Sequence, residues 1–322
     1  MGRNLELAIG ALNGAVGDYL ERTNNGLATA MQLLVNGKPV APAEASRSWQ
    51  TAPDVYTEVP RRLVILVHGL MSTEDVFRFP DGETYASMLA RDFGFAPLEL
   101  RYNSGRRISE NGRSLDELFT SLDQAWPVPL DEFVLIGHSM GGLVIRGATH
   151  AAAERESGWL SKVRRAFYLG APHLGAPLER FGNAVSWALH KVGHPVTRLI
   201  ADIVNLRSVG VKDLRYGNLR REDWEGHDAD ALLQNTRHPV PLLPHIRHHL
   251  IVVSLFTDVE SAILLGDALV PVRSAAGRAK AVDRASPFPQ EHVRILPKMS
   301  HLRLAHDPNV YAQIRAWCEE PL

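Results

Sequence analysis

Short apolar runs alternate with stretches of helical spacing from residue 61 to the end of the chain. Helices are expected at Ser114–Ala125, with Ser114 as the N-cap, and at Val310–Cys318. Buried strands that alternate with helices predict an α/β fold, in which a mostly parallel sheet is covered on both faces. The runs that are apolar enough to be buried strands are Leu63–Val67, Ala96–Leu100, Phe133–Ile136, Ala166–Leu169, Leu250–Phe256 and His292–Leu296.

Two segments depart from this alternation. Residues 1–60 carry apolar positions at helical spacing, which predict two helices. Asn24-Asn25-Gly26 separates these helices, and the second one runs through Leu34. Residues 36–60 are rich in proline and are expected to be an extended connector. The stretch 175–247 is about 70 residues long, which exceeds an ordinary connection, so we expect an inserted helical cap there. The predicted organisation is an N-terminal helical extension over 1–60, a core over 61–174 and 248–322, and a cap over 175–247.

The composition of the chain argues against several classes of protein. The chain has 322 residues, of which 45% are hydrophobic, and a net charge of −1, which argues against nucleic acid as a partner. Cys318 is the single cysteine, so no intrachain disulfide forms, and we expect a structural thiol on the last helix. The N-terminus does not resemble a signal peptide, and no apolar stretch approaches the ~18 residues of a spanning helix, so a cytoplasmic location is expected.

The run Phe133–Ile136 leads directly into Gly137-His138-Ser139-Met140-Gly141, after which an apolar helical pattern resumes. Gly-x-Ser-x-Gly between a buried strand and a helix start is the pattern of a nucleophile elbow, a sharp turn that holds its serine in a strained conformation. Gly137 and Gly141 lack the Cβ atoms that would collide in so tight a turn. Ser139 is therefore the predicted nucleophile.

A serine nucleophile needs a base and a carboxylate that orients the base, and after an elbow the acid precedes the base along the chain. Asp267 is the preferred acid because its loop turns back into an apolar run, and Asp258 is the alternative. His301 is the preferred base because it lies between the last strand and the last helix. His306 is the alternative base, but its neighbour Asp307 indicates the N-cap of the terminal helix.

The oxyanion of a tetrahedral intermediate needs preorganised donors. The backbone N–H of Met140, just after the nucleophile, is one predicted donor, and the N–H of Leu70, in the loop after the first core strand, is the other. Gly69 allows a tight turn there, and His68 is expected to orient the loop.

Four histidines gather just before one predicted strand. His238, His245, His248 and His249 indicate either a metal site or a surface or cap segment. No cysteine or carboxylate accompanies them at ligand spacing, which favours the second interpretation. The chain has no glycine-rich phosphate loop and no dinucleotide fingerprint, so no metal and no cofactor are expected.

Several of these motifs together resemble a known family. The matching segments are Val67–Leu70, Gly137–Gly142, Leu169–Pro177, Gly266–Pro271 and Ser300–Leu302. They resemble an α/β-hydrolase of the bacterial lipase/esterase type, closest to the group related to the GPI inositol-deacylase and to triacylglycerol lipases. The resemblance covers about residues 61–320 and implies ester hydrolysis through a covalent acyl-enzyme.

The leading hypothesis is a serine esterase or lipase that acts on a small-molecule or lipid ester, with medium or long acyl chains favoured by an apolar cap. Acyl transfer to an alcohol or thiol uses the same acyl-enzyme and stays an alternative. A third hypothesis is a non-catalytic protein that associates with lipid or granules through peripheral membrane contact. The sequence does not determine the oligomeric state.

Overall fold

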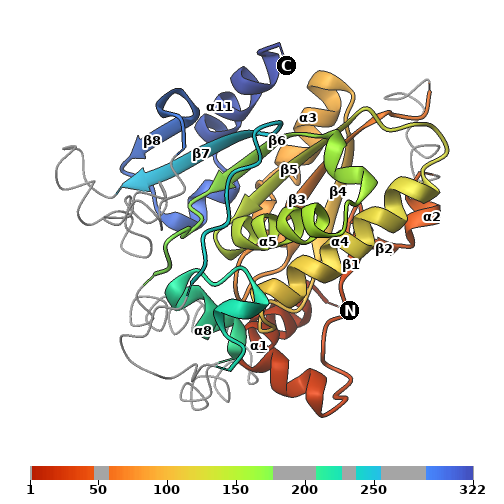
Figure 1. Cartoon of the computed structure of the whole chain (residues 1–322). Coiled ribbons are helices and arrows are strands. Elements are labelled where there is room, and N and C mark those ends of the chain that lie inside the picture. Colours follow the sequence, from red (N-terminus) through yellow and green to blue (C-terminus); the bar gives the residue numbers. More distant parts are fainter. Residues whose placement is uncertain (1, 47–57, 177–207, 227–236, 255–287, 322) are drawn as a thin grey trace.

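The computed structural model describes residues 2–46, 58–176, 208–226, 237–254 and 288–321. In this part of the chain an eight-stranded sheet has the order β2-β1-β4-β3-β5-β6-β7-β8 (Figure 1). Every pairing from β4 across to β8 is parallel, whereas β1 is antiparallel to both β4 and β2. The predicted α/β fold with a mostly parallel sheet is confirmed. The strands are β1 (Gln32–Val35), β2 (Lys38–Val40), β3 (Arg62–Val67), β4 (Ala96–Arg101), β5 (Glu132–His138), β6 (Val163–Leu169), β7 (Arg247–Ser254) and β8 (Val293–Pro297).

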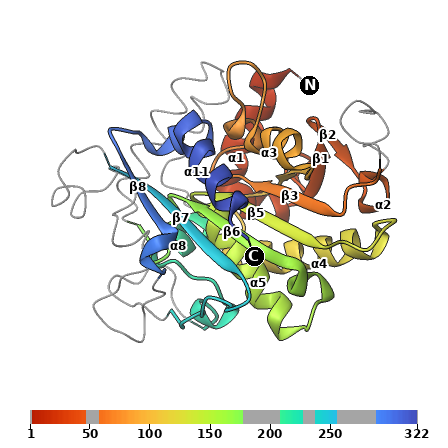
Figure 2. The ribbon, with the colours of Figure 1, turned by 90° about the horizontal axis from the view of Figure 1, so that it is seen from above.

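Helices cover both faces of the sheet. α4 and α5 lie on one face and α3 and α11 on the other, as the two perpendicular views show (Figures 1 and 2). The α-helices are α1 (Arg3–Arg22), α2 (Pro42–Ala45), α3 (Tyr85–Phe93), α4 (Ile108–Ala125), α5 (Met140–Glu154), α8 (Val209–Tyr216) and α11 (Pro308–Glu319). The 3-10 helices are η2 (Glu74–Phe77), η3 (Gly158–Lys162), η4 (Arg221–Asp223), η6 (Gln290–His292) and η7 (His301–Ala305).

Strand β3 shows how the core is divided. Its side chains alternate, so that Leu63 and Ile65 pack with the core under α4 and α5, while Val64 and Leu66 pack with the core under α3 and α11. All four are fully buried, as expected for a central strand of a parallel sheet. None of the described helices combines the length and apolar character needed to cross a bilayer.

The predicted strands from residue 61 onward are confirmed with small shifts of their ends, although Phe256 lies outside the described residues. The predicted terminal helix is α11, and the Asp307 carboxylate caps it by accepting a hydrogen bond from Asn309 N at 2.9 Å. Of the predicted cap, residues 177–207 and 227–236 lie outside the described residues, and α8 and η4 belong to the remainder.

The prediction of a second N-terminal helix is wrong. Residues 32–35 form β1, and part of the expected connector forms β2 and α2. Asn36 and Gly37 both have positive φ, 51° and 72°, which matches the type I′ turn that joins two strands of a hairpin. Leu33 lies opposite Leu100 of β4, so pairing with the edge of the sheet overrides the helical spacing.

The predicted N-cap of α4 is also wrong, because the helix begins at Ile108 instead of at Ser114. Asp213 of α8, which is fully buried, accepts hydrogen bonds from Ile108 N at 3.0 Å and from Arg107 Nη1 at 2.7 Å. Burial raises the pKa of the Asp213 carboxyl to about 6. A side chain 105 residues away thus supplies the first-turn acceptor, which no local sequence signal indicates.

Replacing Asp213 by alanine is expected to lower the free energy of unfolding by about 3 kcal/mol, because the Arg107 guanidinium and the first N–H of α4 lose a buried acceptor. Urea unfolding of the wild type, Asp213→Ala and Asp213→Asn measures this. The asparagine variant keeps one acceptor and should lose less. Equal stability of the wild type and Asp213→Ala would contradict the prediction.

Candidate active site

Ser139 occupies the single residue between β5 and α5. Its backbone has φ 53° and ψ −124°, a conformation that costs energy for any residue with a side chain. The turn is fixed by a hydrogen bond from Ser139 N to Leu169 O at 2.8 Å and by one from Gly142 N to Ser139 O at 3.1 Å. The strained strand-to-helix turn that the sequence predicts is present.

The two glycines of the motif are needed for close backbone contact. A Cβ atom on Gly137 would lie 2.6 Å from Gly142 N, and one on Gly141 would lie 2.5 Å from His68 O. Real Cβ atoms do not approach so closely, and both clashes are with backbone. The turn therefore packs directly on the end of β3.

His301, the predicted base, lies beside this turn. The Nε2 atom of His138 is 3.0 Å from the carbonyl oxygen of His301, and the two rings are 5.0 Å apart. A Cβ on Gly170 would lie 2.9 Å from Cε1 of His301, so the imidazole rests against the backbone of Gly170. Gly170 has φ +64° and follows Leu169, the residue that binds Ser139 N. Gly170 was not among the predicted site residues, although its place directly after a strand was a signal.

The alternative base, His306, is held elsewhere. Its Nδ1 atom is 2.9 Å from Val76 O of η2, and its ring packs on Phe79. The structure therefore brings His301 to the turn and holds His306 against η2. Both carboxylates considered for the acid, Asp267 and Asp258, lie outside the described residues.

The two predicted oxyanion donors belong to segments that adjoin or contact Ser139. Met140 N–H is at the first position of α5, where no intrahelical acceptor exists and the helix dipole favours negative charge. Leu70 follows Gly69, on which an added Cβ would lie 3.1 Å from Ser139 Cβ. The loop after β3 is therefore in contact with the serine, as the predicted role of Leu70 requires.

His68 is buried and orients this loop. Its Nδ1 atom is 2.9 Å from Gly69 O, Tyr102 N lies 3.4 Å from its Nε2 atom, and its ring stacks on Tyr102 at 4.3 Å. Burial lowers the pKa of His68 to about 4, so the ring is neutral at pH 7. The neutral tautomer with Nδ1–H donates to Gly69 O and accepts from Tyr102 N, which fits both contacts. Sequence reasoning missed Tyr102, whose only signal is its place after the strand next to β3.

The surface or cap interpretation of the histidine group is wrong for two of its members. His248 and His249 lie on β7 and are buried. His248 Nδ1 is 2.9 Å from the Tyr168 hydroxyl, and His249 stacks between Phe167 and Trp317. Both side chains are part of the core because β7 is an interior strand of the sheet. Within the described ranges no group of three or more His, Cys, Asp or Glu is placed to hold a metal ion.

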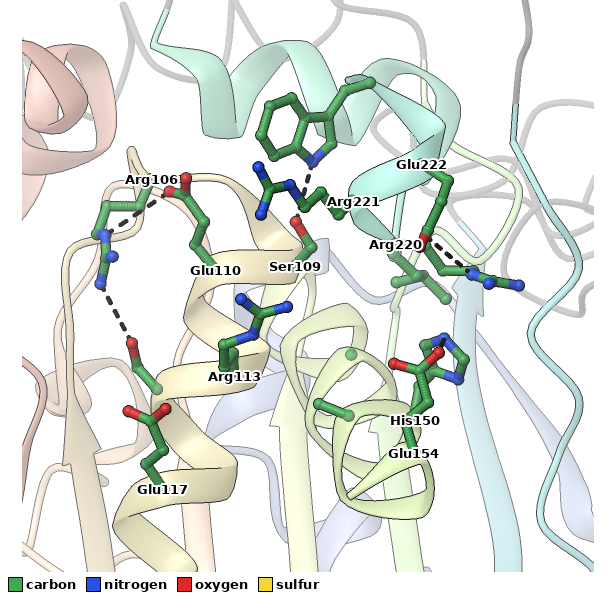
Figure 3. Close-up of a pocket in the computed structure, with 15 residues that line it drawn as sticks. Arg106, Ser109, Glu110, Arg113, Glu117, His150, Glu154, Arg220, Arg221 and Glu222 are labelled. Atoms are coloured by element: carbon green, nitrogen blue, oxygen red, sulfur yellow. Dashed lines mark hydrogen bonds and ion pairs between the residues drawn. The ribbon is translucent and has the colours of Figure 1, made fainter. Parts of the chain in front are cut away.

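A pocket of about 450 Å³ lies beside the C-terminal half of α5, whereas Ser139 precedes the start of that helix. Figure 3 shows the side chains that line the pocket. Side chains of both charges line it, among them Arg106, Arg113, His150 and Glu154. His150 and Glu154 lie 3.4 Å apart, and burial lowers the pKa of His150. None of the predicted catalytic residues belongs to its lining, so we do not assign the chemistry to this pocket.

The chain is similar to known proteins in part of its sequence and in structure. Residues 103–246 match the PGAP1-like alpha/beta domain family. Lipase BlEst2 of Bacillus licheniformis in its mature form is similar in structure, with a TM-score of 0.49, 15% identity, and coverage of 81% of this chain and 94% of that chain. Carboxylesterase CesB (YbfK) of Bacillus subtilis gives a TM-score of 0.45, 11% identity, and coverage of 87% and 99%. No curated protein matches the chain in sequence.

The strand order of the mostly parallel sheet and the positive-φ serine between β5 and α5 are typical of one fold, and residues 103–246 match a PGAP1-like domain. The chain has an α/β-hydrolase fold, and a segment of it is similar to the PGAP1-like domain.

Proposed function

We propose that this protein is a serine hydrolase that cleaves carboxylic esters. The observation that carries the proposal is the strained backbone of Ser139, between a buried strand and a helix, with His301 packed beside it. Strain of this kind persists only where surrounding structure imposes it, and it is frequent at active sites. The fold and the family match support ester hydrolysis in general.

In the proposed reaction Ser139 Oγ attacks the ester carbonyl while His301 takes the hydroxyl proton. The tetrahedral intermediate collapses when the C–O bond to the alcohol breaks, and His301 gives the proton to the leaving oxygen. Water then attacks the acyl-Ser139, again with His301 as base, and releases the acid. We assign the carboxylate that orients His301 to Asp267.

The negative charge of the intermediate develops on the former carbonyl oxygen. We assign its stabilisation to the N–H groups of Leu70 and Met140, which belong to the two segments that flank Ser139. Donors held in place before the reaction stabilise the transition state without reorganisation. The N-terminus of α5 adds its dipole to the same charge.

Labelling with a fluorophosphonate tests the proposal directly, because this probe reacts with an activated serine. The wild type should be labelled, Ser139→Ala should not, and His301→Ala should react far more slowly. Ser161→Ala is the matched control, since Ser161 is an exposed serine on η3. Equal labelling of the wild type and Ser139→Ala, or a wild type that is not labelled, would overturn the proposal.

A further inference from the structure

Helix α1 presents glycines to the loop that follows β3. A Cβ on Gly10 would lie 2.6 Å from Thr73 Cγ2 and 3.1 Å from Ser72 O. A Cβ on Gly14 would lie 2.6 Å from both Cα and N of Met71. The backbones of helix and loop therefore touch, and at Gly14 no side-chain movement can make room.

The contacted loop is the one that carries Leu70. On one side of Leu70, Gly69 packs on Ser139. On the other side, Met71 has φ +56°, donates its N–H to Ser104 Oγ at 3.0 Å, and packs on Gly14. Leu70 thus lies between one residue that packs on the serine turn and one that packs on α1.

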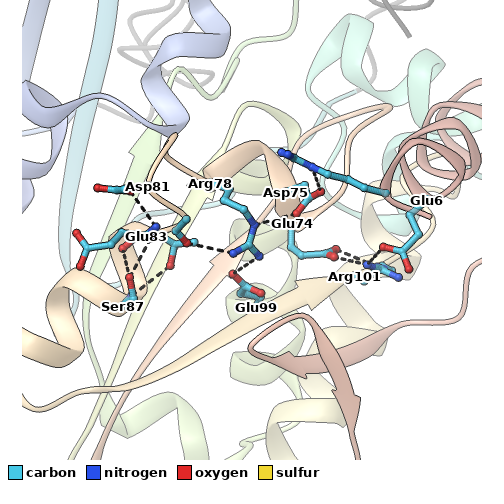
Figure 4. Close-up of polar contacts among 12 residues, drawn as sticks. Glu6, Glu74, Asp75, Arg78, Asp81, Glu83, Ser87, Glu99 and Arg101 are labelled. Atoms are coloured by element: carbon cyan, nitrogen blue, oxygen red, sulfur yellow. Dashed lines mark hydrogen bonds and ion pairs between the residues drawn. The ribbon is translucent and has the colours of Figure 1, made fainter. Parts of the chain in front are cut away.

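Ion pairs tie the first turns of α1 to the segment just beyond this loop (Figure 4). Glu6 lies 3.1 Å from Arg101 of β4, which in turn binds Glu74 of η2 at 2.9 Å. Arg3 pairs with Asp75 at 2.9 Å. Glu74 is only 2% exposed, so its pair with Arg101 is better shielded from solvent than a surface ion pair.

Ser208 makes a second contact with α1. The Ser208 hydroxyl donates to Gly14 O at 2.7 Å, and Ser208 N donates to Ala15 O at 3.0 Å. These carbonyls are available because α1 is kinked at Val16, whose φ and ψ are −143° and 23°. Gly14 therefore touches the loop while its own carbonyl is anchored.

We propose that α1 is a positioning element for the oxyanion hole: its glycine face sets the place of Leu70 N–H relative to Ser139. The inference rests on the proposed hydrolase function and extends it to a segment that the sequence analysis placed outside the catalytic core. Gly10 and Gly14 are positioning residues in this account, since they act through Leu70 and touch no substrate.

Gly14→Ala is expected to lower kcat/KM for a p-nitrophenyl ester by about 10- to 100-fold, mostly through kcat, because the loop must move away from the new methyl group. Affinity for a trifluoromethyl ketone, whose adduct places an oxyanion in the hole, should fall in parallel. KM should stay within about 2-fold, because the ground state uses these donors less.

A second substitution that restores kcat distinguishes a positioning role from a general loss of stability. Gly10→Ala should lower kcat because the new methyl group strikes Thr73 Cγ2, and adding Thr73→Ser removes that atom. The double variant is therefore expected to recover most of the loss, with Thr73→Ser alone as the reference. This readout remains available if Gly14→Ala does not fold.

Two controls complete the design. Gly2→Ala makes the same chemical change at the start of α1, where nothing lies within 4 Å, and should keep kcat within about 2-fold. Phe119→Leu loosens the core under α4, against Phe133 and Trp159, and reports what lost stability alone does to kcat.

Different outcomes would contradict the proposed function and the role of α1. If Ser139→Ala retains ester hydrolysis, the proposed function is wrong. If Ser139→Ala is inactive while a folded Gly14→Ala keeps wild-type kcat and inhibitor affinity, or if Thr73→Ser does not restore a folded Gly10→Ala, only the role of α1 is wrong.

Discussion

Replacing Ser139 by alanine is expected to lower kcat for a carboxylic ester by about 10⁴- to 10⁶-fold, because no acyl-enzyme can form without the hydroxyl. KM should change little, since Oγ contributes mainly to the transition state. The loss should be similar for His301→Ala, and the double variant should lose no more than either single one. Groups that act as a unit give this non-additive result.

Steady-state kinetics with p-nitrophenyl esters measures these losses. His306→Ala is the matched control, because His306 binds Val76 O instead of lying at the turn. It should keep kcat within a few-fold of the wild type. A large loss of kcat for His306→Ala together with an active His301→Ala would show that His306, and not His301, is the base.

Acid is expected to destabilise the protein from about pH 6 downward, a pH above the pKa values of ordinary carboxylates. Burial lowers the pKa of His68 to about 4 and the pKa values of His248 and His249 to about 3, and it holds that of His173 well below its ordinary value. These four histidines are neutral in the folded protein. In the unfolded chain each binds a proton below pH ~6.5.

Unfolding near pH 5 therefore takes up about four protons at these histidines. Two carboxyls act in the opposite direction, since burial raises the pKa of Glu99 to about 7 and that of Asp213 to about 6, and each releases a proton on unfolding. The balance is about two protons taken up. The free energy of unfolding should fall by about 2 to 3 kcal/mol for each pH unit between pH 6 and pH 4.

Urea unfolding at intervals of half a pH unit tests this slope. His249→Phe is the informative variant, because its ring is stacked between Phe167 and Trp317 and neither nitrogen has a hydrogen-bond partner among the described residues. It should reduce the slope by about one proton. A wild type whose stability is level from pH 6 to pH 4 would show that these histidines titrate normally.

Local patterns predicted the parts of the fold that local sequence determines. The buried strands, the turn at Ser139 and the cap at Asp307 each depend on neighbouring residues, and each is present. The predictions failed where contact with a distant segment determines the local structure. Pairing with β4 turns the Leu34 segment into a strand, and the contact with Asp213 starts α4 about two turns earlier than Ser114 suggests.

Chemistry was harder to predict than fold for the same reason. His301 was predicted from its order after the elbow, and the structure places it at the turn, whereas Gly170, on which its ring rests, carries no sequence signal beyond its position after a strand. His248 and His249 look polar in sequence, yet the strand that holds them is interior. The close backbone contacts that the glycines of α1 allow are seen only in the structure, where the helix lies on the Leu70 loop.

The bond from Ser208 to Gly14 also has a consequence for synthesis of the protein. The two partners are 194 positions apart, so a ribosome adding 5–20 residues per second needs about 10 to 40 s after making Gly14 before Ser208 exists. During that interval α1 and the Leu70 loop lack this anchor, and His301 has still to be made. On the proposed mechanism, a nascent chain cannot hydrolyse esters until the segment that carries His301 has left the ribosome.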